Sequence, residues 1–377
     1  MTGGRLVFAI PGDLATPSGG YGYDRRLMVE LEGLGWQVEH LALPGGFPQP
    51  SAKDLETAEA ALAALPDGSI VLVDGLAFGA MPQVAARQAE RLRLVALVHH
   101  PLCLETGLDA AVQARLEASE RMALASARAV VVTSAATADT LIAEFSVPRA
   151  RLTVALPGTD KPERHDGAGT GTGEGSGCRG TKTGPGSGSG DRAGPPRILS
   201  IGTLIARKDH ATLVDGLTLV ADLAWQCRIV GSKSADPQTS AALERQIAAR
   251  GLAGRIDLAG SLPDVSTEYR GADLFVLASR YEGYGMVFAE AMANGLPIVS
   301  CAEGAPRDLI PAEAGRRFAP SDADDLAAAL RALLTDPPAL ARAASASLAA
   351  GRALPSWRQT AETVAGALAG VTMDGAP

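Results

Sequence analysis

Several classes of protein are excluded by what this chain of 377 residues contains little of. Aromatic residues make up 4% and charged residues 20% of it, whereas hydrophobic residues make up 46%. The formal net charge is −8, so the chain lacks the basic excess that binding to a nucleic-acid backbone requires. We therefore expect a soluble globular protein that does not bind nucleic acid.

Cysteine is scarce, and the four cysteines are widely spaced. Cys103, Cys178, Cys227 and Cys301 form no C-x-x-C pair, so neither a zinc site nor a disulfide framework is indicated. No apolar run approaches the ~18 residues of a membrane span, and the N-terminus has no signal-peptide pattern. These absences predict a cytoplasmic protein whose membrane contact, if it has one, is peripheral and on the inner face.

Glycine, by contrast, is abundant at 43 residues and unevenly distributed. It is concentrated between Asp166 and Gly194, where almost nothing is apolar. Such a segment cannot bury enough surface to offset its ordering entropy, so a flexible linker is predicted. The predicted organisation is a first domain over 1–160, a linker over 161–195, a second domain over 196–355, and a C-terminal helix and tail over 356–377 that cross back to the first domain.

Short apolar runs alternate with amphipathic segments on both sides of this linker. This alternation is typical of parallel strands joined by right-handed crossovers, and it predicts two facing, doubly wound Rossmann-like α/β domains. Ligands bind beyond the carboxyl ends of such strands, so the site is expected in an interdomain cleft. The predicted strands are Arg5–Ile10, Val38–Leu43, Ile70–Leu76, Leu92–His99, Ala129–Thr133, Leu152–Leu156, Arg197–Gly202, Gln226–Gly231, Arg255–Ala259, Leu274–Leu277, Pro297–Ser300 and Gly315–Phe318.

Two candidate sites lie in the first domain. Gly19 and Gly20 precede a helix predicted to begin near Tyr23, where backbone N–H groups can approach an anion, although a purely structural turn is the alternative. They do not form G-x-G-x-x-G, so the dinucleotide fingerprint is absent. His99 and His100 end a predicted strand, where an imidazole can donate to a sugar hydroxyl or a carbonyl. Neighbours on a strand point to opposite faces, so one histidine is expected to reach the ligand.

Two further candidates lie in the second domain. Arg207 and Lys208 precede a helix, where cations oppose the helix dipole; a bound polyanion would explain them, and solvated charges are the alternative. Glu282 and Glu290 flank Gly283–Val287, which presents free backbone N–H groups at another helix start. Carboxylates suit sugar hydroxyls, whereas amides and cations suit a diphosphate, so this division favours a sugar nucleotide.

Together these motifs resemble the retaining glycosyltransferases of family 4, which have the GT-B fold. The resemblance covers the chain apart from the linker and is densest from Arg197 to Leu334. It is carried by the E-x7-E spacing of Glu282 and Glu290, the core Gly283-Tyr-Gly-Met286, the segment Gly295-Leu-Pro297, the Arg207-Lys208 loop and Gly19-Gly20.

The resemblance implies a role for each matching residue. Glu290 is implied to bind the ribose hydroxyls, Lys208 and Arg207 the diphosphate, and Glu282 the donor sugar. Catalytic roles are implied for His99, His100, Glu282 and Lys208. The remaining donor contacts are Gly19 and Gly20 at the β-phosphate, Ser261 and Leu262 at the base, and Gly283, Tyr284, Gly285, Met286 and Val287 at the sugar and phosphate.

The chain departs from the family pattern at two places. The family usually has Gly-Arg after the first strand of the second domain, but this chain has Gly202-Thr203, so Arg207 is expected to supply the guanidinium. The later Gly-Gly-x-x-Glu element appears as Gly304-Ala-Pro-Arg-Asp308. Both departures concern the contacts to the donor sugar and not the reaction class.

The predicted function is a retaining hexosyl transfer from a UDP- or GDP-sugar, with no cofactor and no metal. Lys208, Arg207 and helix N-termini can stabilise the leaving diphosphate. Asp322-Ala-Asp324 is interpreted as a helix cap and not as a metal-binding D-x-D motif. Retention would come from attack by the acceptor hydroxyl on the face that the phosphate leaves, because no carboxylate nucleophile of the retaining-hydrolase kind is evident.

The acceptor and two alternative functions are left open. The acceptor is a membrane lipid of the diacylglycerol type, a cell-surface glycan or a small molecule. Arg87, Arg91 and Arg93 lie among apolar residues in a pattern that favours peripheral contact with an anionic membrane, an ordinary solvated helix face being the alternative. A sugar-nucleotide epimerase and a non-catalytic sugar-nucleotide binder are the alternative functions.

Overall fold

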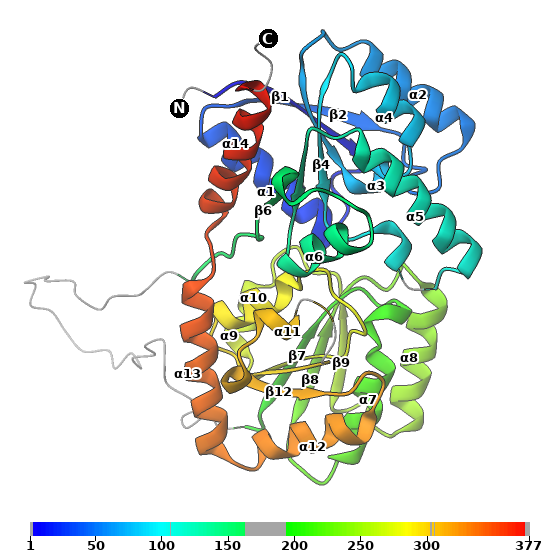
Figure 1. Cartoon of the computed structure of the whole chain (residues 1–377). Coiled ribbons are helices and arrows are strands. Elements are labelled where there is room, and N and C mark those ends of the chain that lie inside the picture. Colours follow the sequence, from blue (N-terminus) through cyan, green and yellow to red (C-terminus); the bar gives the residue numbers. More distant parts are fainter. Residues whose placement is uncertain (1–2, 106, 163–193, 302–303, 305, 374–377) are drawn as a thin grey trace, which may run out of the picture. The chain divides into compact units, whose positions relative to one another are not determined.

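The computed structural model of the chain describes most of its residues, and it divides into two compact units (Figure 1). The first unit comprises Met1–Gly158, Gly283–Met286 and Pro355–Pro377; the second comprises Thr159–Glu282 and Val287–Leu354. The residues described are 3–105, 107–162, 194–301, 304 and 306–373. The predicted linker, apart from its ends, and Cys178 therefore lie outside the described residues.

The sheet of the first unit has six parallel strands in the order β2-β1-β3-β4-β5-β6. Successive strand residues, such as Val71 and Leu72, belong to separate buried clusters, one on each face. Burial on both faces explains the unbroken apolar runs. The strands are β1 (Arg5–Pro11), β2 (Gln37–Leu43), β3 (Ile70–Asp74), β4 (Arg93–Val98), β5 (Ala129–Val132) and β6 (Leu152–Val154). The helices between them are α1 (Gly19–Gly33), α2 (Ala52–Ala63), α3 (Gly75–Phe78), α4 (Pro82–Gln88), α5 (Ala110–Ala125) and α6 (Ala135–Ala143).

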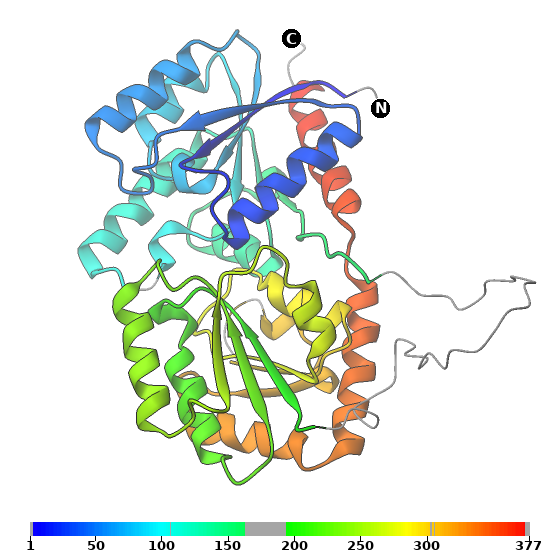
Figure 2. The same cartoon turned by 180° about the vertical axis from the view of Figure 1, so that it is seen from behind.

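The C-terminal helix α14 (Trp357–Met373) packs beside α1 on one face of this first sheet (Figures 1 and 2). Its buried side chains recur every three or four residues, as helical periodicity requires, and they are Trp357, Ala361, Val364, Leu368 and Val371. The Thr360 hydroxyl donates to the carbonyl oxygen of Leu156 at 2.7 Å. Gly158 is needed where the chain leaves the sheet, because a Cβ there would lie 2.3 Å from the Cα of Trp357.

The sheet of the second unit also has six parallel strands, in the order β12-β11-β10-β7-β8-β9. Residues of β10 alternate between two buried clusters, as in the first unit. The strands are β7 (Arg197–Ile201), β8 (Gln226–Val230), β9 (Ile256–Gly260), β10 (Leu274–Leu277), β11 (Ile298–Cys301) and β12 (Gly315–Phe318). The helices that follow them are α7 (His210–Leu219), α8 (Pro237–Ala249), α9 (Ser266–Gly271), α10 (Met286–Ala293), α11 (Pro306–Leu309), α12 (Ala323–Leu334) and α13 (Pro337–Ala353).

Each sheet has one point at which the direction of strand addition reverses. In the first unit, β2 lies on one side of β1 and β3 lies on the other, so the reversal falls between β1 and β3. In the second unit, β8 and β10 lie on opposite sides of β7, so the reversal falls between β7 and β10. Open α/β sheets bind their ligands beyond the carboxyl ends of the strands at such a switch point. The loops after β1, β3, β7 and β10 are therefore the ones to inspect.

Among the predicted element boundaries that differ from the structure, two in the first unit have a local cause. Helix α1 begins at Gly19 instead of near Tyr23, because the Ser18 hydroxyl accepts the backbone N–H of Tyr21 at 3.3 Å and caps the helix there. The run from Ile70 leaves the strand at Asp74, whose carboxylate accepts the N–H of Leu76 and starts α3. The predicted cap at Asp322 is confirmed, since its carboxylate accepts the N–H of Asp325 at 2.9 Å.

Candidate functional site

The switch point of the second sheet brings together three of the residues predicted to bind the donor. Lys208 ends a 3₁₀ turn that follows β7, and Glu282 follows β10. The Nζ of Lys208 lies 2.5 Å from Oε1 of Glu282, and Nη1 of Arg207 lies 3.6 Å from Oε2 of the same carboxylate. Arg207 also donates through Nη1 to the carbonyl oxygen of Tyr281 at 2.7 Å. The sequence placed these residues on separate loops, and the fold makes them one cluster.

The charges of this cluster can be assigned from its contacts. Only 8% of Glu282 is exposed, and burial alone would raise its pKa. The positive charges of Lys208 and Arg207 outweigh that effect and lower the pKa, so Glu282 is a carboxylate at neutral pH. Two cations thus surround one anion. The cluster has a positive balance, which suits a phosphate group that shares the two cations with Glu282.

The path of the Lys208 side chain depends on the glycine that ends the preceding strand. A Cβ at Gly202 would lie 3.3 Å from Cδ of Lys208, so a larger residue would press against the lysine's alkyl chain. The buried imidazole of His210 donates through Nε2 to the carbonyl oxygen of Gly202 at 3.2 Å. Burial lowers the pKa of His210 to about 4, so the imidazole is neutral and donates from Nε2. Gly202 therefore lies against the Lys208 side chain and, through its carbonyl oxygen, contacts the imidazole of His210, and both contacts fix the start of the loop that carries Lys208.

Glu290 lies on α10 and is held by a partner that the sequence analysis did not identify. Its Oε2 accepts the hydroxyl of Tyr269, on α9, at 2.7 Å. Burial raises the pKa of Glu290 to about 6; the Tyr269 hydrogen bond opposes this, and the charge of Asp160 adds to it. The Tyr269 bond leaves Oε1 to accept from a ligand. Nothing in the sequence around Tyr269 distinguishes it from an ordinary core tyrosine.

The other predicted donor contacts take the following positions. Gly283–Val287 forms the turn into α10, and Gly285 adopts a φ of +83°, a left-handed conformation that favours glycine. Tyr284 is buried, with 7% exposed. Ser261 is exposed and Leu262 is half-buried, and both follow β9. Gly304, in the second departure from the family pattern, has a φ of +78°, and a Cβ there would lie 2.8 Å from the carbonyl oxygen of Glu282. Ala305 of this element lies outside the described residues.

At the switch point of the first sheet, His99 lies between two buried carboxylates. It directly follows β4, which ends at Val98, and its Nε2 lies 3.1 Å from Oδ1 of Asp24 and 3.5 Å from Oδ2 of Asp74. Asp24 projects from α1, and Asp74 ends β3. Both carboxylates are almost fully buried, at 0% and 2% exposed. The imidazole ring of His99 also meets the ring of Tyr23 edge to face, with centroids 5.2 Å apart.

These contacts fix the charge of His99. Burial alone would lower its pKa, but the charges and hydrogen bonds of Asp24 and Asp74 raise it to about 10. Burial raises the pKa of Asp24 to about 6, against the effect of His99. Gly20 belongs to the same arrangement, since a Cβ there would lie 3.4 Å from Cδ2 of His99. The sequence analysis missed both aspartates, although Asp74 carried a signal, a carboxylate directly at the end of a buried apolar run.

The same three side chains have the composition of a metal site. Within the described ranges, Asp24, Asp74 and His99 form the group whose ligand atoms lie within 4.8 Å of one another. Their distances equally suit one imidazole N–H shared between two carboxylates. The prediction that this protein acts without a metal can therefore be tested at this cluster.

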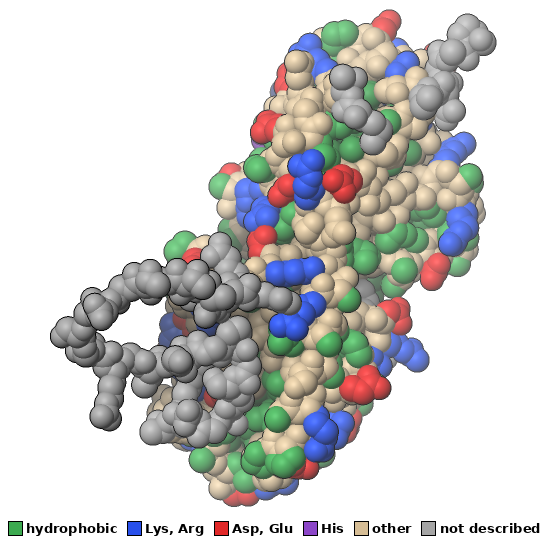
Figure 3. All heavy atoms as spheres, turned by 90° about the vertical axis from the view of Figure 1, so that its left-hand side faces the viewer, with side chains coloured by type: hydrophobic (Ala, Val, Ile, Leu, Met, Phe, Trp, Pro, Cys, Tyr) green, Lys and Arg blue, Asp and Glu red, His purple; other side chains and the backbone are tan. Residues whose placement is uncertain are grey.

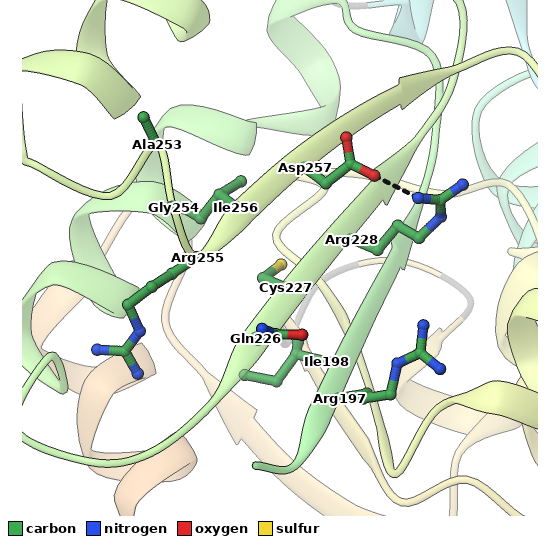
Figure 4. Close-up of a pocket in the computed structure, with 10 residues that line it drawn as sticks. All are labelled: Arg197, Ile198, Gln226, Cys227, Arg228, Ala253, Gly254, Arg255, Ile256 and Asp257. Atoms are coloured by element: carbon green, nitrogen blue, oxygen red, sulfur yellow. Dashed lines mark hydrogen bonds and ion pairs between the residues drawn. The ribbon is translucent and has the colours of Figure 1, made fainter. Parts of the chain in front are cut away.

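A pocket of about 230 Å³ in the second unit lies at the wrong edge of the sheet for this chemistry (Figure 4). It is lined by the amino-terminal residues of β7, β8 and β9, opposite the edge that carries Lys208. Arg228 is paired with Asp257 and with Glu268. Arg255 donates to three carbonyl oxygens and stacks 3.6 Å over the ring of Trp225. Arg228 and Arg255 thus serve the fold.

The basic segment predicted to face a membrane is largely neutralised. Arg87 forms an ion pair with Glu59, and Arg91 forms one with Asp67. Figure 3 draws a different face, on the side of α13 and α14, and there too Lys and Arg are interspersed with Asp and Glu. None of the helices in the described part of the chain has the length and hydropathy of a membrane span.

Family models match both halves of the chain. The model described as "Glycosyl transferases group 1" matches residues 195–336, and the model described as "Glycosyl transferase 4-like domain" matches residues 10–158. These matches contain the second-unit cluster and the His99 cluster, respectively. Together they span most of the chain on both sides of the predicted linker.

Individual proteins agree with these matches. The chain is 36% identical over 118 residues to a mannosylfructose-phosphate synthase of Agrobacterium fabrum, covering 28% of this chain and 25% of that protein. It is 33% identical over 152 residues to the lipopolysaccharide core biosynthesis mannosyltransferase LpsB of Rhizobium meliloti, covering 40% and 39%. Each match thus spans less than two fifths of the relative's length.

A solved structure supports the fold over the whole chain. Anabaena Alr3699/HepE, solved in complex with UDP and glucose, superposes with a TM-score of 0.71 at 17% identity, covering 97% of this chain and 99% of that one. The predicted GT-B fold, with two Rossmann-like units, is thereby confirmed. The two family models and the shared fold together show that this protein belongs to the group 1 glycosyltransferases.

Proposed function

We propose that this protein transfers a hexose from a UDP- or GDP-sugar to an acceptor hydroxyl, with retention of anomeric configuration. The observation that carries the proposal is the cluster of Lys208, Arg207 and Glu282 at the switch point of the second sheet. Two cations around one buried carboxylate match the two parts of such a donor, a diphosphate and a hydroxyl-bearing sugar. The complex of the related fold with UDP and glucose supports this class of donor.

In the proposed reaction, the bond between the anomeric carbon and the diphosphate oxygen breaks, and negative charge grows on the leaving diphosphate. Lys208 and Arg207 stabilise that charge when they turn from Glu282 to the phosphates. The acceptor oxygen bonds to the anomeric carbon on the same face, and its proton passes to the leaving phosphate oxygen. Because two fixed cations supply the charge that a divalent metal would supply, we propose that no metal takes part.

Glu290 and His99 have supporting roles in this scheme. Tyr269 fixes one oxygen of Glu290, so the other is oriented to accept from the ribose hydroxyls. The imidazolium of His99, whose Nε2 is directed at Asp24 and Asp74, has Nδ1 left to donate to a hydroxyl of the donor sugar. Whether His99 or His100 makes that contact stays a prediction.

For the acceptor, we propose a sugar or glycan hydroxyl. The names of the two relatives, a mannosylfructose-phosphate synthase and a lipopolysaccharide core mannosyltransferase, support this class and make mannose the first hexose to test. The ion pairs of Arg87 and Arg91 leave little basic surface for the lipid acceptor that the sequence suggested.

The proposal is tested by a transfer screen read by mass spectrometry. Wild type and Glu290→Ala are incubated with UDP- and GDP-hexoses, each with and without a panel of sugar, glycan and diacylglycerol acceptors. We expect acceptor-dependent release of nucleoside diphosphate, weakened at least tenfold in the variant, and a product whose anomeric configuration by NMR matches the donor. Donor epimerisation without acceptor, or nucleotide binding without transfer to any acceptor, would overturn it.

A further inference from the structure

We propose that Asp209 is a positioning residue, which ties together the two loops that carry Lys208 and Glu282 and thereby sets the cations for a nucleoside diphosphate. The inference rests on the proposed function, because it assigns a role within the same site. Asp209 is not part of the motifs that carry the family resemblance. Every residue that the argument uses belongs to the second unit.

The backbone of Asp209 is the first sign of such a role. It occupies the N-cap position of α7 with φ 47° and ψ 41°, a left-handed conformation that few residues other than glycine adopt. Aspartate is favoured at N-caps because its carboxylate accepts the N–H groups of the first turn. The Asp209 side chain makes no such cap. The backbone is therefore strained at Asp209, and its carboxylate makes contacts other than a cap on the backbone N–H groups of α7.

The carboxylate instead joins three loops. Only 6% of Asp209 is exposed, and its Oδ2 accepts Nε of Arg280 at 3.0 Å and the hydroxyl of Ser321 at 2.8 Å. Burial would raise the pKa of Asp209, but hydrogen bonds from Arg280, Ser321 and Thr212 and the charge of Arg280 lower it, so the group is charged at neutral pH. Ser321 is itself left-handed, with φ 56°. Two strained residues thus meet at one carboxylate.

The position of this contact connects it to the site. Lys208 directly precedes Asp209, and Glu282 lies two residues after Arg280. The backbone N–H of Arg280 donates to the carbonyl oxygen of Arg207 at 2.9 Å, which makes a second link between the same two loops. Because the ion pair and this hydrogen bond flank the Lys208–Glu282 contact, they set the separation of the lysine and the carboxylate before any nucleotide binds.

A contribution to stability alone does not account for the arrangement. The Arg280 side chain is 52% exposed, so water screens its charge, although the carboxylate of Asp209 is buried. A conventional N-cap by the same aspartate would stabilise α7 directly. Asp209 therefore does not cap the backbone of α7, and its carboxylate instead aligns the two loops.

The test compares Asp209→Gly with Asp209→Asn. Glycine adopts the left-handed backbone freely, so Asp209→Gly removes the carboxylate without adding strain. Asparagine also tolerates this backbone and keeps an oxygen that can accept from Arg280 and Ser321. Asp336→Gly is the control, because Asp336 is an N-cap of the same unit that does accept a backbone N–H, that of Ala339 at 2.9 Å.

Three measurements are made on the full chain: hydrogen exchange of the nucleotide-free protein, calorimetric titration with UDP and GDP, and steady-state kinetics. For Asp209→Gly we expect faster exchange in the peptides that contain Lys208 and Glu282, nucleotide affinity lowered about tenfold, and donor KM raised about as much with kcat within threefold. Asp209→Asn should recover part of the loss. Asp336→Gly should lower Tm and leave both peptides and nucleotide affinity unchanged.

Unchanged exchange in both peptides of Asp209→Gly, or unchanged nucleotide affinity, would overturn the positioning role. So would equal losses in Asp209→Gly and Asp336→Gly, since that would indicate a general loss of stability. If wild type binds neither UDP nor GDP, the proposed function fails by itself, while the exchange measurement still decides whether Asp209 holds the two loops together.

Discussion

The switch points of the two sheets carry clusters of ionisable side chains with opposite balances of charge. At β7 and β10, Lys208 and Arg207 surround one carboxylate, Glu282. At β1 and β3, Asp24 and Asp74 surround one imidazole, that of His99. The surplus of cations in the second unit attracts a phosphate group. The surplus of buried carboxylates in the first unit would repel a phosphate group and instead stabilises an imidazolium. The shared topology places both clusters, and their side chains decide what each can hold.

The clusters also differ in the sign of the charge that their members leave uncompensated. In the first unit, the protonated His99 offsets one of two buried carboxylates, and the surplus is negative. In the second unit, Glu282 offsets only one of two cations, and the surplus is positive. We therefore expect changes in the second-unit cluster to act on nucleotide binding and turnover, and changes in the first-unit cluster to act on stability and on the sugar. The predictions that follow test this division, beginning with the largest effect.

Removing Lys208 should have the largest effect on turnover. Lys208→Ala leaves Arg207 alone to face the leaving diphosphate, and loss of one such charge-stabilising donor typically lowers kcat by ~10²–10³. Steady-state kinetics with the donor identified in the transfer screen would measure this. Lys53→Ala is the matched control, since Lys53 is 83% exposed in the first unit. Wild-type turnover in Lys208→Ala would contradict the assignment of the second-unit cluster to the leaving group.

Removing His99 should reduce the loss of stability at alkaline pH. The pKa of about 10 in the folded protein lies above the ordinary histidine value of 6.5, so the imidazolium contributes stability that is complete below about pH 6.5 and is lost as pH rises through 10. The loss is on the order of a few kcal/mol. Calorimetric Tm values at pH 7, 8.5 and 10 should fall in wild type and fall less in His99→Gln.

His210→Gln is the control for this measurement. Burial lowers the pKa of His210 to about 4, so its imidazole is already neutral at pH 7 and contributes nothing to the alkaline loss. The variant should therefore keep the wild-type slope between pH 7 and pH 10. If Tm falls with pH equally steeply in wild type and in His99→Gln, His99 is not a cation held between Asp24 and Asp74.

Removing the charge of Glu282 should strengthen binding of the free nucleotide. In the nucleotide-free protein Glu282 forms ion pairs with both Lys208 and Arg207, so a diphosphate must compete with its carboxylate for these cations. Glu282→Gln should lower the Kd for UDP or GDP about three- to tenfold while slowing transfer, because the sugar contact is weakened. Glu290→Gln, on the helix that follows, should have the opposite effect on Kd. Titration calorimetry distinguishes the two, and weaker nucleotide binding by Glu282→Gln would refute the competition.

Chelation should have the smallest effect. If the cluster of Asp24, Asp74 and His99 shares a proton and holds no metal, EDTA should change the rate of transfer by less than about twofold. Added Mg²⁺ or Mn²⁺ should likewise change the rate by less than about twofold. Metal analysis of the purified protein provides a second readout. A stoichiometric metal that is lost in Asp74→Asn would overturn both the metal-free mechanism and the description of His99 as an imidazolium.

The sequence was sufficient for the strands and for the side chains of the second-unit cluster. Strands buried on both faces have unbroken apolar runs, and nearly all of the predicted strands match the structure to within one or two residues. Lys208 and Glu282 could be identified because each lies in a loop that joins such a strand to a helix. Boundaries such as those at Gly19 and Asp74 were wrong because a single cap, from Ser18 or from Asp74 itself, overrides the local pattern.

The residues that hold the site in place could not be predicted. The sequence assigned no role to Tyr269, Asp24, Asp209 or Arg280. Each acts through a partner between 21 and 75 positions away in the chain. Charge state had the same limit: a histidine with a pKa of about 10 and another with one of about 4 have ordinary sequence surroundings. Burial and neighbouring charges, which only the folded chain defines, set both values.

The sequence by itself determined the architecture and the kind of chemistry, because periodicity, strand-end position and residue type are local properties of the chain. Its composition also led to two expectations: the shortage of basic charge argues against nucleic-acid binding, and the cluster of glycines predicts a linker. Tertiary structure alone decided which side chains share a site and with what charge. Strand order brings together the loops after β7 and β10, and the segments that follow β1, β3 and β4. In the chain, 74 positions separate Lys208 from Glu282, and 75 separate Asp24 from His99.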